Sequence, residues 1–129
     1  MNDDAAIRNV VARLALLADE GDLEEYAGLF TEDGLWEMPG STIQGRADLL
    51  AGAIERRASG NVGPGTNTRH VITTQAVELD GDQAHSDAYF QFWVNTATEP
   101  SVVLFGRYRD RLVRTDQGWK LAHRHISYG

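Results

Sequence analysis

The hydrophobic pattern of this chain changes from a helical period to a period of two at about Thr66. Before that point, apolar residues recur three and four positions apart, which predicts amphipathic helices. After it, apolar and polar residues alternate, which predicts half-buried strands. Helices followed by a run of hairpin-connected strands are typical of an α+β fold, in which the helices cover one face of an antiparallel sheet.

Three helices are expected in the first half, with one short strand between the second and the third. The expected elements are helices over residues 5–20, 22–30 and 45–59, a turn over 31–34 and a strand over 35–38. The glycine-rich segment 60–65 leads into a strand rather than into a helix N-terminus, so it does not fit a phosphate-binding loop.

The second half is expected to form four strands joined by short turns. They cover residues 68–79, 83–96, 101–114 and 119–128. A strongly curved antiparallel sheet, closed off by the three N-terminal helices, makes a cone with an apolar pocket inside. No linker is long enough to divide the chain, and 129 residues bury a core without staples, so residues 1–129 are expected to form one domain.

Composition and charge exclude several classes of function. The chain has no cysteine, which excludes a thiolate nucleophile and a disulfide framework. Its formal net charge of −7 argues against a nucleic-acid partner. No apolar run approaches the roughly 18 residues of a membrane span, and the N-terminus lacks a basic signal-peptide start. We therefore expect a cytoplasmic protein without a membrane partner.

Asp19 is a charge at an unusual place in the first expected helix. It continues an apolar stripe formed by Ala12, Ala15 and Leu16, and it lies in the last helical turn, where the helix dipole disfavours a carboxylate. Both features single out Asp19 as a proton carrier or a histidine partner. The alternative is that Asp19 belongs to a polar exit from the helix, and periodicity leaves both interpretations open.

The order of elements and several short motifs resemble the nuclear transport factor 2-like superfamily, in particular its SnoaL-like branch. The motifs are LADEGD (17–22), LFTEDG (29–34) with Trp36, RH (69–70), GRYRD (106–110) and GWKLAHR (118–124). The resemblance covers nearly the whole chain. It implies the fold more specifically than the reaction, because this superfamily includes dehydratases, isomerases, epoxide hydrolases, cyclases and non-catalytic subunits.

The resemblance also implies a set of catalytic residues. Scytalone dehydratase and hexachlorocyclohexane dehydrochlorinase use an aspartate at the end of the first helix to orient a histidine base, and these positions fall on Asp19 and His70. The arginine that the dehydrochlorinase places after its last-strand tryptophan falls on Arg124. Strict alternation puts Arg124 on the face opposite Trp119, so it reaches the pocket only if a β-bulge intervenes. The dehydrochlorinase lysine falls near Leu14, which argues against a polyhalogenated substrate.

Two further groups of residues have a possible role in binding. His123 and His125 share one face of a strand and, with His85 or Asp87, form a conceivable metal site. No spacing fixes a third ligand and the resembling family is usually metal-free, so no metal and no cofactor are expected. Most aromatic residues are expected in the core. The candidates for lining the pocket are Trp36, Met38 and Tyr108.

These features lead to one functional expectation and several alternatives. The expectation is a cofactor-independent lyase or isomerase of dehydratase type, in which His70 takes a proton from a small apolar substrate, Asp19 orients His70, and Arg124 or Tyr108 stabilises the developing charge. The alternatives are a non-catalytic small subunit of an aromatic-ring hydroxylase, an apolar-ligand binding protein, and an epoxide hydrolase or polyketide cyclase. A homo-oligomer, dimer or trimer, is expected through the sheet face that carries Arg107, Arg109 and Arg111.

Overall fold

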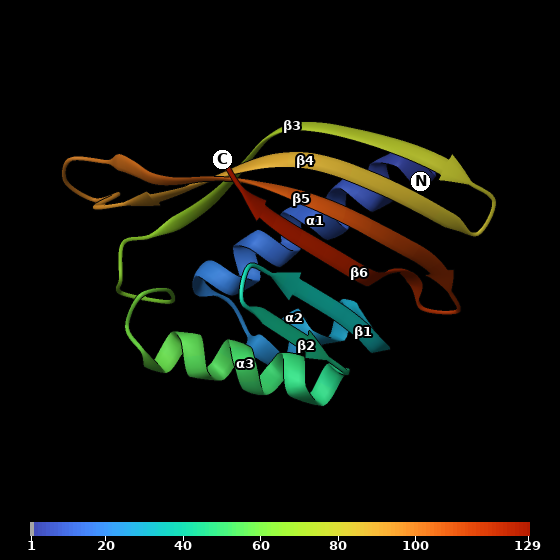
Figure 1. Ribbon diagram of the computed structural model, residues 1–129, viewed down its shortest axis with the longest axis horizontal. Helices are drawn as coiled ribbons and strands as arrows, with labels where there is room; N and C mark the ends of the chain where they lie inside the picture. Colours follow the sequence, from blue (N-terminus) through green and yellow to red (C-terminus); the bar gives the residue numbers. More distant parts are fainter. Residues whose placement is uncertain (1) are drawn as a thin grey trace.

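The computed structural model describes residues 2–129, and its elements follow the predicted order (Figure 1). The helices are α1 (Asp3–Glu20), α2 (Leu23–Gly28) and α3 (Arg46–Ala58). The strands are β1 (Phe30–Met38), β2 (Ser41–Gln44), β3 (Arg69–Asp80), β4 (Gln83–Val94), β5 (Ser101–Thr115) and β6 (Gly118–Tyr128). Within these residues, no helix is long and apolar enough to cross a membrane.

Local sequence explains where α1 begins and ends. The side chain of Asn2 caps its N-terminus by accepting a hydrogen bond from the Ala5 amide at 2.7 Å. At the other end, a Cβ on residue 21 would lie 2.6 Å from the Leu17 side chain, so glycine is needed there for close approach rather than for backbone freedom. The helix α1 thus ends one residue after Asp19, with Gly21 as its C-cap.

The second helix is shorter than predicted. Asp22 caps its N-terminus by accepting a hydrogen bond from the Glu24 amide at 3.0 Å. The helix ends at Gly28 instead of Phe30, because Phe30 is fully buried and pairs with Leu121 as the first residue of β1. Tertiary pairing thus overrides the helical spacing of Phe30.

The sheet has six strands in the order β2-β1-β6-β5-β4-β3, and it is curved and unclosed. Strands β3 to β6 form the predicted antiparallel meander. The expectation of a wholly antiparallel sheet is wrong in one place, because β1 runs parallel to β6. The α+β class with three N-terminal helices on one side of a curved sheet is confirmed.

The prediction of a turn over residues 31–34 is wrong. These residues lie inside β1, where the pairing with β6 jumps from Phe30↔Leu121 to Leu35↔His123. The pairing with β6 is irregular across this gap, and the Gly34 carbonyl accepts a hydrogen bond from the Gly45 amide at 2.8 Å. The edge strand β2 was not predicted, since four residues are too few to show a period.

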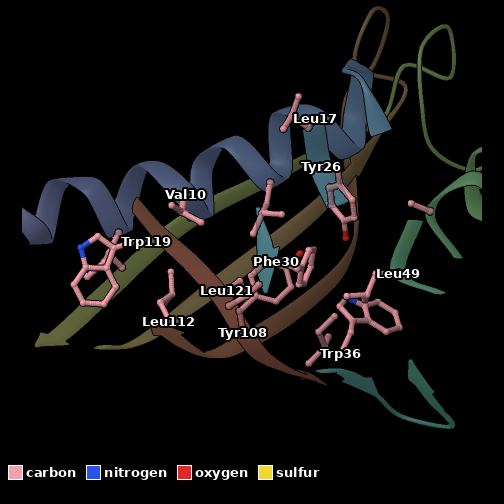
Figure 2. Close-up of a cluster of buried hydrophobic side chains, with 14 of the residues drawn as sticks. Val10, Leu17, Tyr26, Phe30, Trp36, Leu49, Tyr108, Leu112, Trp119 and Leu121 are labelled. Atoms are coloured by element: carbon pink, nitrogen blue, oxygen red, sulfur yellow. The ribbon is translucent and has the colours of Figure 1, made fainter. Parts of the chain in front are cut away.

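The core lies between the helices and the concave face of the sheet (Figure 2). Helix α1 packs along β3, while α3 packs on α2 and β1. The buried apolar side chains include Val10 and Leu17 of α1, Tyr26 of α2, Phe30 and Trp36 of β1, and Tyr108, Leu112, Trp119 and Leu121 of the meander. This packing leaves one end of the concave face unfilled.

A β-bulge in β6 decides which of its side chains face the core. The pairing with β5 passes from Arg111↔His123 to Leu112↔Leu121, so Ala122 is an extra residue in β6. Trp119, Leu121 and Arg124 are consequently all buried, whereas strict alternation would have separated Arg124 from the other two. The bulge required for Arg124 to face inward is present.

Candidate functional site

A cavity of about 230 Å³ lies between the helices and the concave face of the sheet. Its wall is mainly apolar and is formed by the three helices, strands β1 and β3 to β6, and the loop before β3. Five of the residues predicted from the sequence line it: Trp36, Met38, His70, Tyr108 and Arg124. Asp19 does not line the cavity but lies behind His70.

Asp19 and His70 are joined by two hydrogen bonds. The Asp19 Oδ2 accepts the His70 backbone N–H at 2.9 Å, and Oδ1 lies 2.7 Å from the ring Nδ1. The Asp19 side chain is 2 % exposed and that of His70 is 20 % exposed. The carboxylate therefore fixes both the backbone and the ring of His70 and leaves Nε2 as the ring nitrogen that is free toward the cavity.

The His70 ring is also packed between aromatic side chains. Its centroid lies 4.8 Å from that of Phe92 and 6.3 Å from that of Phe90, both on the neighbouring strand β4. These contacts and the two bonds to Asp19 restrict the ring to one orientation.

Arg124 forms a buried ion pair with Asp110. The Arg124 Nε and Nη2 each donate to one carboxylate oxygen of Asp110, both at 2.9 Å. The side chains are 6 % and 0 % exposed, respectively. Burial would lower the pKa of Arg124, but the Asp110 carboxylate more than offsets this, so the pKa lies above its ordinary value and Arg124 stays charged.

Tyr108 is sandwiched between an aromatic ring and the Arg124 guanidinium. The Phe90 ring stacks on it at a centroid distance of 4.1 Å, and the Arg124 Cζ lies 3.7 Å from its ring centroid. Burial raises the pKa of Tyr108, while the Arg124 charge partly opposes this. Tyr108 is therefore a hydrogen-bond donor at neutral pH.

The two carboxylate-containing pairs lie at different positions along the sheet, as the register of β4 shows. On β4, Phe92 pairs with His70, and six residues away Ser86 pairs with Asp110. Six residues span about 20 Å of strand, although the curved sheet and the long Arg124 side chain shorten the gap between the functional groups. We call these the His70 end and the Arg124 end of the cavity.

Epoxide hydrolysis would need a second acid beside Asp19, and Asp110 and Asp87 are the aspartates of the central strands β5 and β4. Asp110 does face inward, but both of its oxygens are bonded to Arg124. Asp87 lies on the outer face of the sheet, where it is paired with Arg107. Neither carboxylate is placed to activate a water opposite Asp19.

The histidines proposed as metal ligands lie on the outer face of the sheet. His123 Nε2 is 2.8 Å from a Glu37 carboxylate oxygen, and the His125 side chain is exposed beside it. In the described residues, 2–129, no group of three or more histidine, aspartate or glutamate side chains is arranged to hold a metal ion.

Several residues of the site and its surroundings were not predicted from the sequence, and three of them illustrate why. Tyr26 was assigned to the core, but its ring reaches from α2 toward the strands and lines the cavity (Figure 2). Val62 of the glycine-rich loop forms part of the wall, and Arg57 of α3 caps the end of α1. Helical or loop spacing gives no signal for any of these contacts.

Comparison with known proteins identifies the family. A model of the SnoaL-like domain matches residues 1–125. Among curated proteins, none matches the chain. Solved structures do match: an NTF2-like protein with a cystatin-like fold from Novosphingobium aromaticivorans has 26% identity and a TM-score of 0.86, covering 98% of this chain and 81% of its own.

Two further structures are similar over nearly the whole chain. A variant of Rv3472, a protein of unknown function from Mycobacterium tuberculosis, has 32% identity and a TM-score of 0.83, with 97% of this chain and 70% of that chain covered. A protein from Catenulispora acidiphila, solved in complex with S-DNPA, has 26% identity and a TM-score of 0.81, with 96% and 91% covered. The chain therefore belongs to the SnoaL-like domain family, within the nuclear transport factor 2-like superfamily.

Proposed function

We propose that this protein is a cofactor-independent lyase or isomerase that removes a proton from carbon in a small, largely apolar molecule. The observation that carries the proposal is the 2.7 Å contact between Asp19 and His70 at the wall of an apolar cavity. A carboxylate on one imidazole nitrogen holds the proton there and leaves the other nitrogen as a base, which proton abstraction at neutral pH requires.

The His70 end of the cavity supplies the base. With Nδ1 protonated toward Asp19, the lone pair of Nε2 is available to a C–H bond of the bound molecule. When Nε2 takes the proton, the ring becomes positively charged, and the buried Asp19 carboxylate stabilises that charge. The electron pair of the broken C–H bond passes into the substrate and either expels a leaving group or is returned when carbon is reprotonated elsewhere.

The Arg124 end supplies hydrogen-bond donors for the substrate. Developing negative charge on a carbonyl oxygen conjugated to the reacting carbon is stabilised by a donor in a site with little water. Tyr108 offers a hydroxyl, and Arg124 retains Nη1 beyond the two nitrogens bonded to Asp110. All three residues line the same cavity, so the proposed pose places a ring system there with the reacting carbon near His70 and the oxygen near Tyr108.

The size of the cavity limits the substrate. An apolar cavity of about 150 Å³ takes a benzene-sized ligand, so about 230 Å³ suits a substituted ring or a small two-ring molecule. The similar Catenulispora acidiphila protein was solved with a small molecule, S-DNPA, which supports ligand binding by this fold at 26% identity. Small-molecule binding is the part of the proposal that the family supports; proton abstraction rests on the His70 geometry.

Deuterium exchange tests the proposal without knowledge of the natural substrate. The protein is incubated in D₂O with 2-tetralone, a two-ring ketone with acidic α-protons, and the loss of α-proton signal is followed by NMR. We expect exchange above the buffer rate that is abolished in His70→Ala. The matched control is His85→Ala, which removes an exposed histidine of the outer face and is expected to exchange at the unaltered rate.

Equal exchange rates in His70→Ala and in the unaltered protein would rule out His70 as the base. Binding of 2-tetralone without any exchange above buffer would favour the non-catalytic alternative, a protein that only holds an apolar ligand.

A further inference from the structure

The Arg124 end of the cavity contains a positive charge that is already neutralised. Asp110 engages Arg124 Nε and Nη2 with both of its oxygens, and the two side chains are almost completely buried. Paired charges of this kind present little net field to a ligand, whereas a single buried guanidinium would strongly attract an anion.

The donors that remain at this end are weak or uncharged. The Tyr108 and Tyr26 hydroxyls line the cavity and make no hydrogen bond with another side chain or carbonyl in residues 2–129. Burial raises the pKa of Tyr108, so its hydroxyl keeps its proton. Together with Arg124 Nη1, these groups offer more donors than the two lone pairs of one neutral carbonyl oxygen can accept.

We propose that Asp110 is a specificity-determining residue. By neutralising Arg124, it makes the cavity bind an uncharged oxygen acceptor, such as a ketone, in preference to a carboxylate. This inference rests on the proposed function in placing the ligand in the same cavity. A carboxylate that entered would lose its hydration and gain no uncompensated positive charge in return. A ketone oxygen loses much less hydration free energy on entering the cavity, and it still accepts hydrogen bonds from the same donors.

The other charges around the cavity do not reverse this preference. The Asp19 carboxylate behind His70 is negative and repels an anion at the opposite end. Arg56 lies at the rim, with its Cζ 5.0 Å from the Trp36 ring centroid. Its side chain is only partly buried, so water screens its charge.

The outer face of the sheet provides a matched control for the Asp110–Arg124 pair. Asp87 and Arg107 form the same two-bond arrangement, through Nε and Nη2, on the neighbouring strands β4 and β5. This pair is partly exposed and lies away from the cavity lining. Removing the Asp87 charge therefore changes the net charge of the protein by the same amount without changing the cavity.

The test compares two ligands of nearly equal shape, acetophenone and benzoate, in which a methyl group is replaced by a charged oxygen. Each is titrated into ¹⁵N-labelled protein, and the shift of the Arg124 Nε signal gives the dissociation constant. We expect the unaltered protein and Asp87→Asn to bind acetophenone more tightly. In Asp110→Asn, the freed Arg124 charge is expected to shift the ratio toward benzoate by about tenfold or more.

Two results would overturn the inference: benzoate binding at least as tightly as acetophenone in the unaltered protein, or an unchanged ratio in folded Asp110→Asn. If Asp110→Asn does not fold, the double variant Asp110→Asn/Arg124→Gln removes both charges and keeps a polar pair. Because that double variant lacks Arg124, its dissociation constants are read from the ¹⁵N signals of His70, which lines the same cavity. It is expected to retain the preference for acetophenone, and a gain in benzoate binding there would contradict the proposal.

The outcome is independent of proton abstraction. A preference for acetophenone without any deuterium exchange would remove the proposed lyase or isomerase activity and leave the role of Asp110 standing. Deuterium exchange that depends on His70, without a preference for acetophenone over benzoate, would support the proposed activity and remove the proposed role of Asp110.

Discussion

Arg57 closes the end of the helix that carries Asp19 by donating from Nη2 to the Leu17 carbonyl at 3.0 Å. The same guanidinium donates to the carbonyls of Ala18, at 3.1 Å, and Gly21, at 2.8 Å. A residue of the third helix thus satisfies the last carbonyls of the first and places a positive charge at its negative end. The positive charge of Arg57 therefore offsets the unfavourable interaction between the Asp19 carboxylate and the negative end of the helix dipole.

We expect Arg57→Met to destabilise the protein by about 2–3 kcal/mol, because three carbonyls lose a charged donor. The neighbouring Arg56→Met serves as the control, since Arg56 contacts the Trp36 ring and makes no hydrogen bond with residues 2–129 that closes a helix. Urea denaturation of both variants gives the comparison. A loss of stability no larger in Arg57→Met than in Arg56→Met would show that water replaces the guanidinium at this helix end.

The fold and part of the site could be predicted from the sequence because they depend on periodic or local signals. The change of period at about Thr66 separates helices from strands, and caps such as Asp22 are local. The position of Asp19 at the end of an apolar stripe indicated a special role, and the resemblance paired it with His70. Their hydrogen bonds show that the two residues do meet.

The remaining features depend on pairing between distant strands, which no local pattern encodes. The extra residue Ala122 in β6 becomes visible only when the register with β5 is known, and it turns Arg124 inward. The partner of Arg124 was missed for the same reason, because Asp110 lies directly opposite it on the neighbouring strand β5. For Phe30, a local pattern was present but misleading. Its helical spacing predicted a place in the second helix, whereas pairing with β6 places it in the sheet.

Gly106→Ala is predicted to disturb the stack that holds Tyr108. A Cβ at this position would lie 2.2 Å from the Phe90 ring, which crosses β5 there and stacks on Tyr108. We expect a loss of about 1–3 kcal/mol from overpacking, together with weaker ligand binding. The control is Gly28→Ala, where nothing lies within 4 Å of the added atom. An equal decrease in melting temperature in both variants would contradict a steric clash between the added methyl group and Phe90.

Asp3→Asn is predicted to lower stability in a pH-dependent manner. Hydrogen bonds from Arg114 and Trp119 lower the pKa of Asp3 to about 2. A carboxyl group with a depressed folded-state pKa stabilises the protein above its unfolded pKa, and this contribution is lost as pH falls through the folded value. The melting temperatures of Asp3→Asn and the unaltered protein should therefore differ at pH 7 and converge near pH 2. A constant difference from pH 7 to pH 2 would contradict this assignment.

We expect the protein to form a dimer or trimer through the outer face of the sheet. This face combines exposed apolar side chains, such as Tyr89 at 47% and Phe105 at 48% exposure, with the arginine row that includes Arg109. Exposed aromatic and arginine side chains are enriched at protein interfaces. Light scattering should give a multiple of the 14.2 kDa chain mass, and Phe105→Glu should reduce it. A monomer mass at micromolar concentration would refute this expectation.

The sharpest prediction concerns the tautomer of His70 in Asp19→Asn. In the unaltered protein, the carboxylate oxygens face two groups of His70, the backbone N–H and Nδ1. An asparagine can still accept the backbone N–H with its oxygen, but its amide nitrogen then donates to Nδ1. The ring proton is thereby moved to Nε2, and the nitrogen that faces the cavity can no longer act as a base.

Deuterium exchange in Asp19→Asn is therefore expected to fall by roughly 10³–10⁴-fold, the size of effect that a wrong tautomer produces in a catalytic triad. The ¹⁵N shifts of the His70 ring report the tautomer directly. Glu37→Gln is the matched control, because it makes the same change at the other histidine–carboxylate contact, His123–Glu37, on the outer face. Loss of exchange in Asp19→Asn with an unchanged His70 tautomer would assign the effect to the missing charge alone, and full exchange with the altered tautomer would exclude Nε2 as the base.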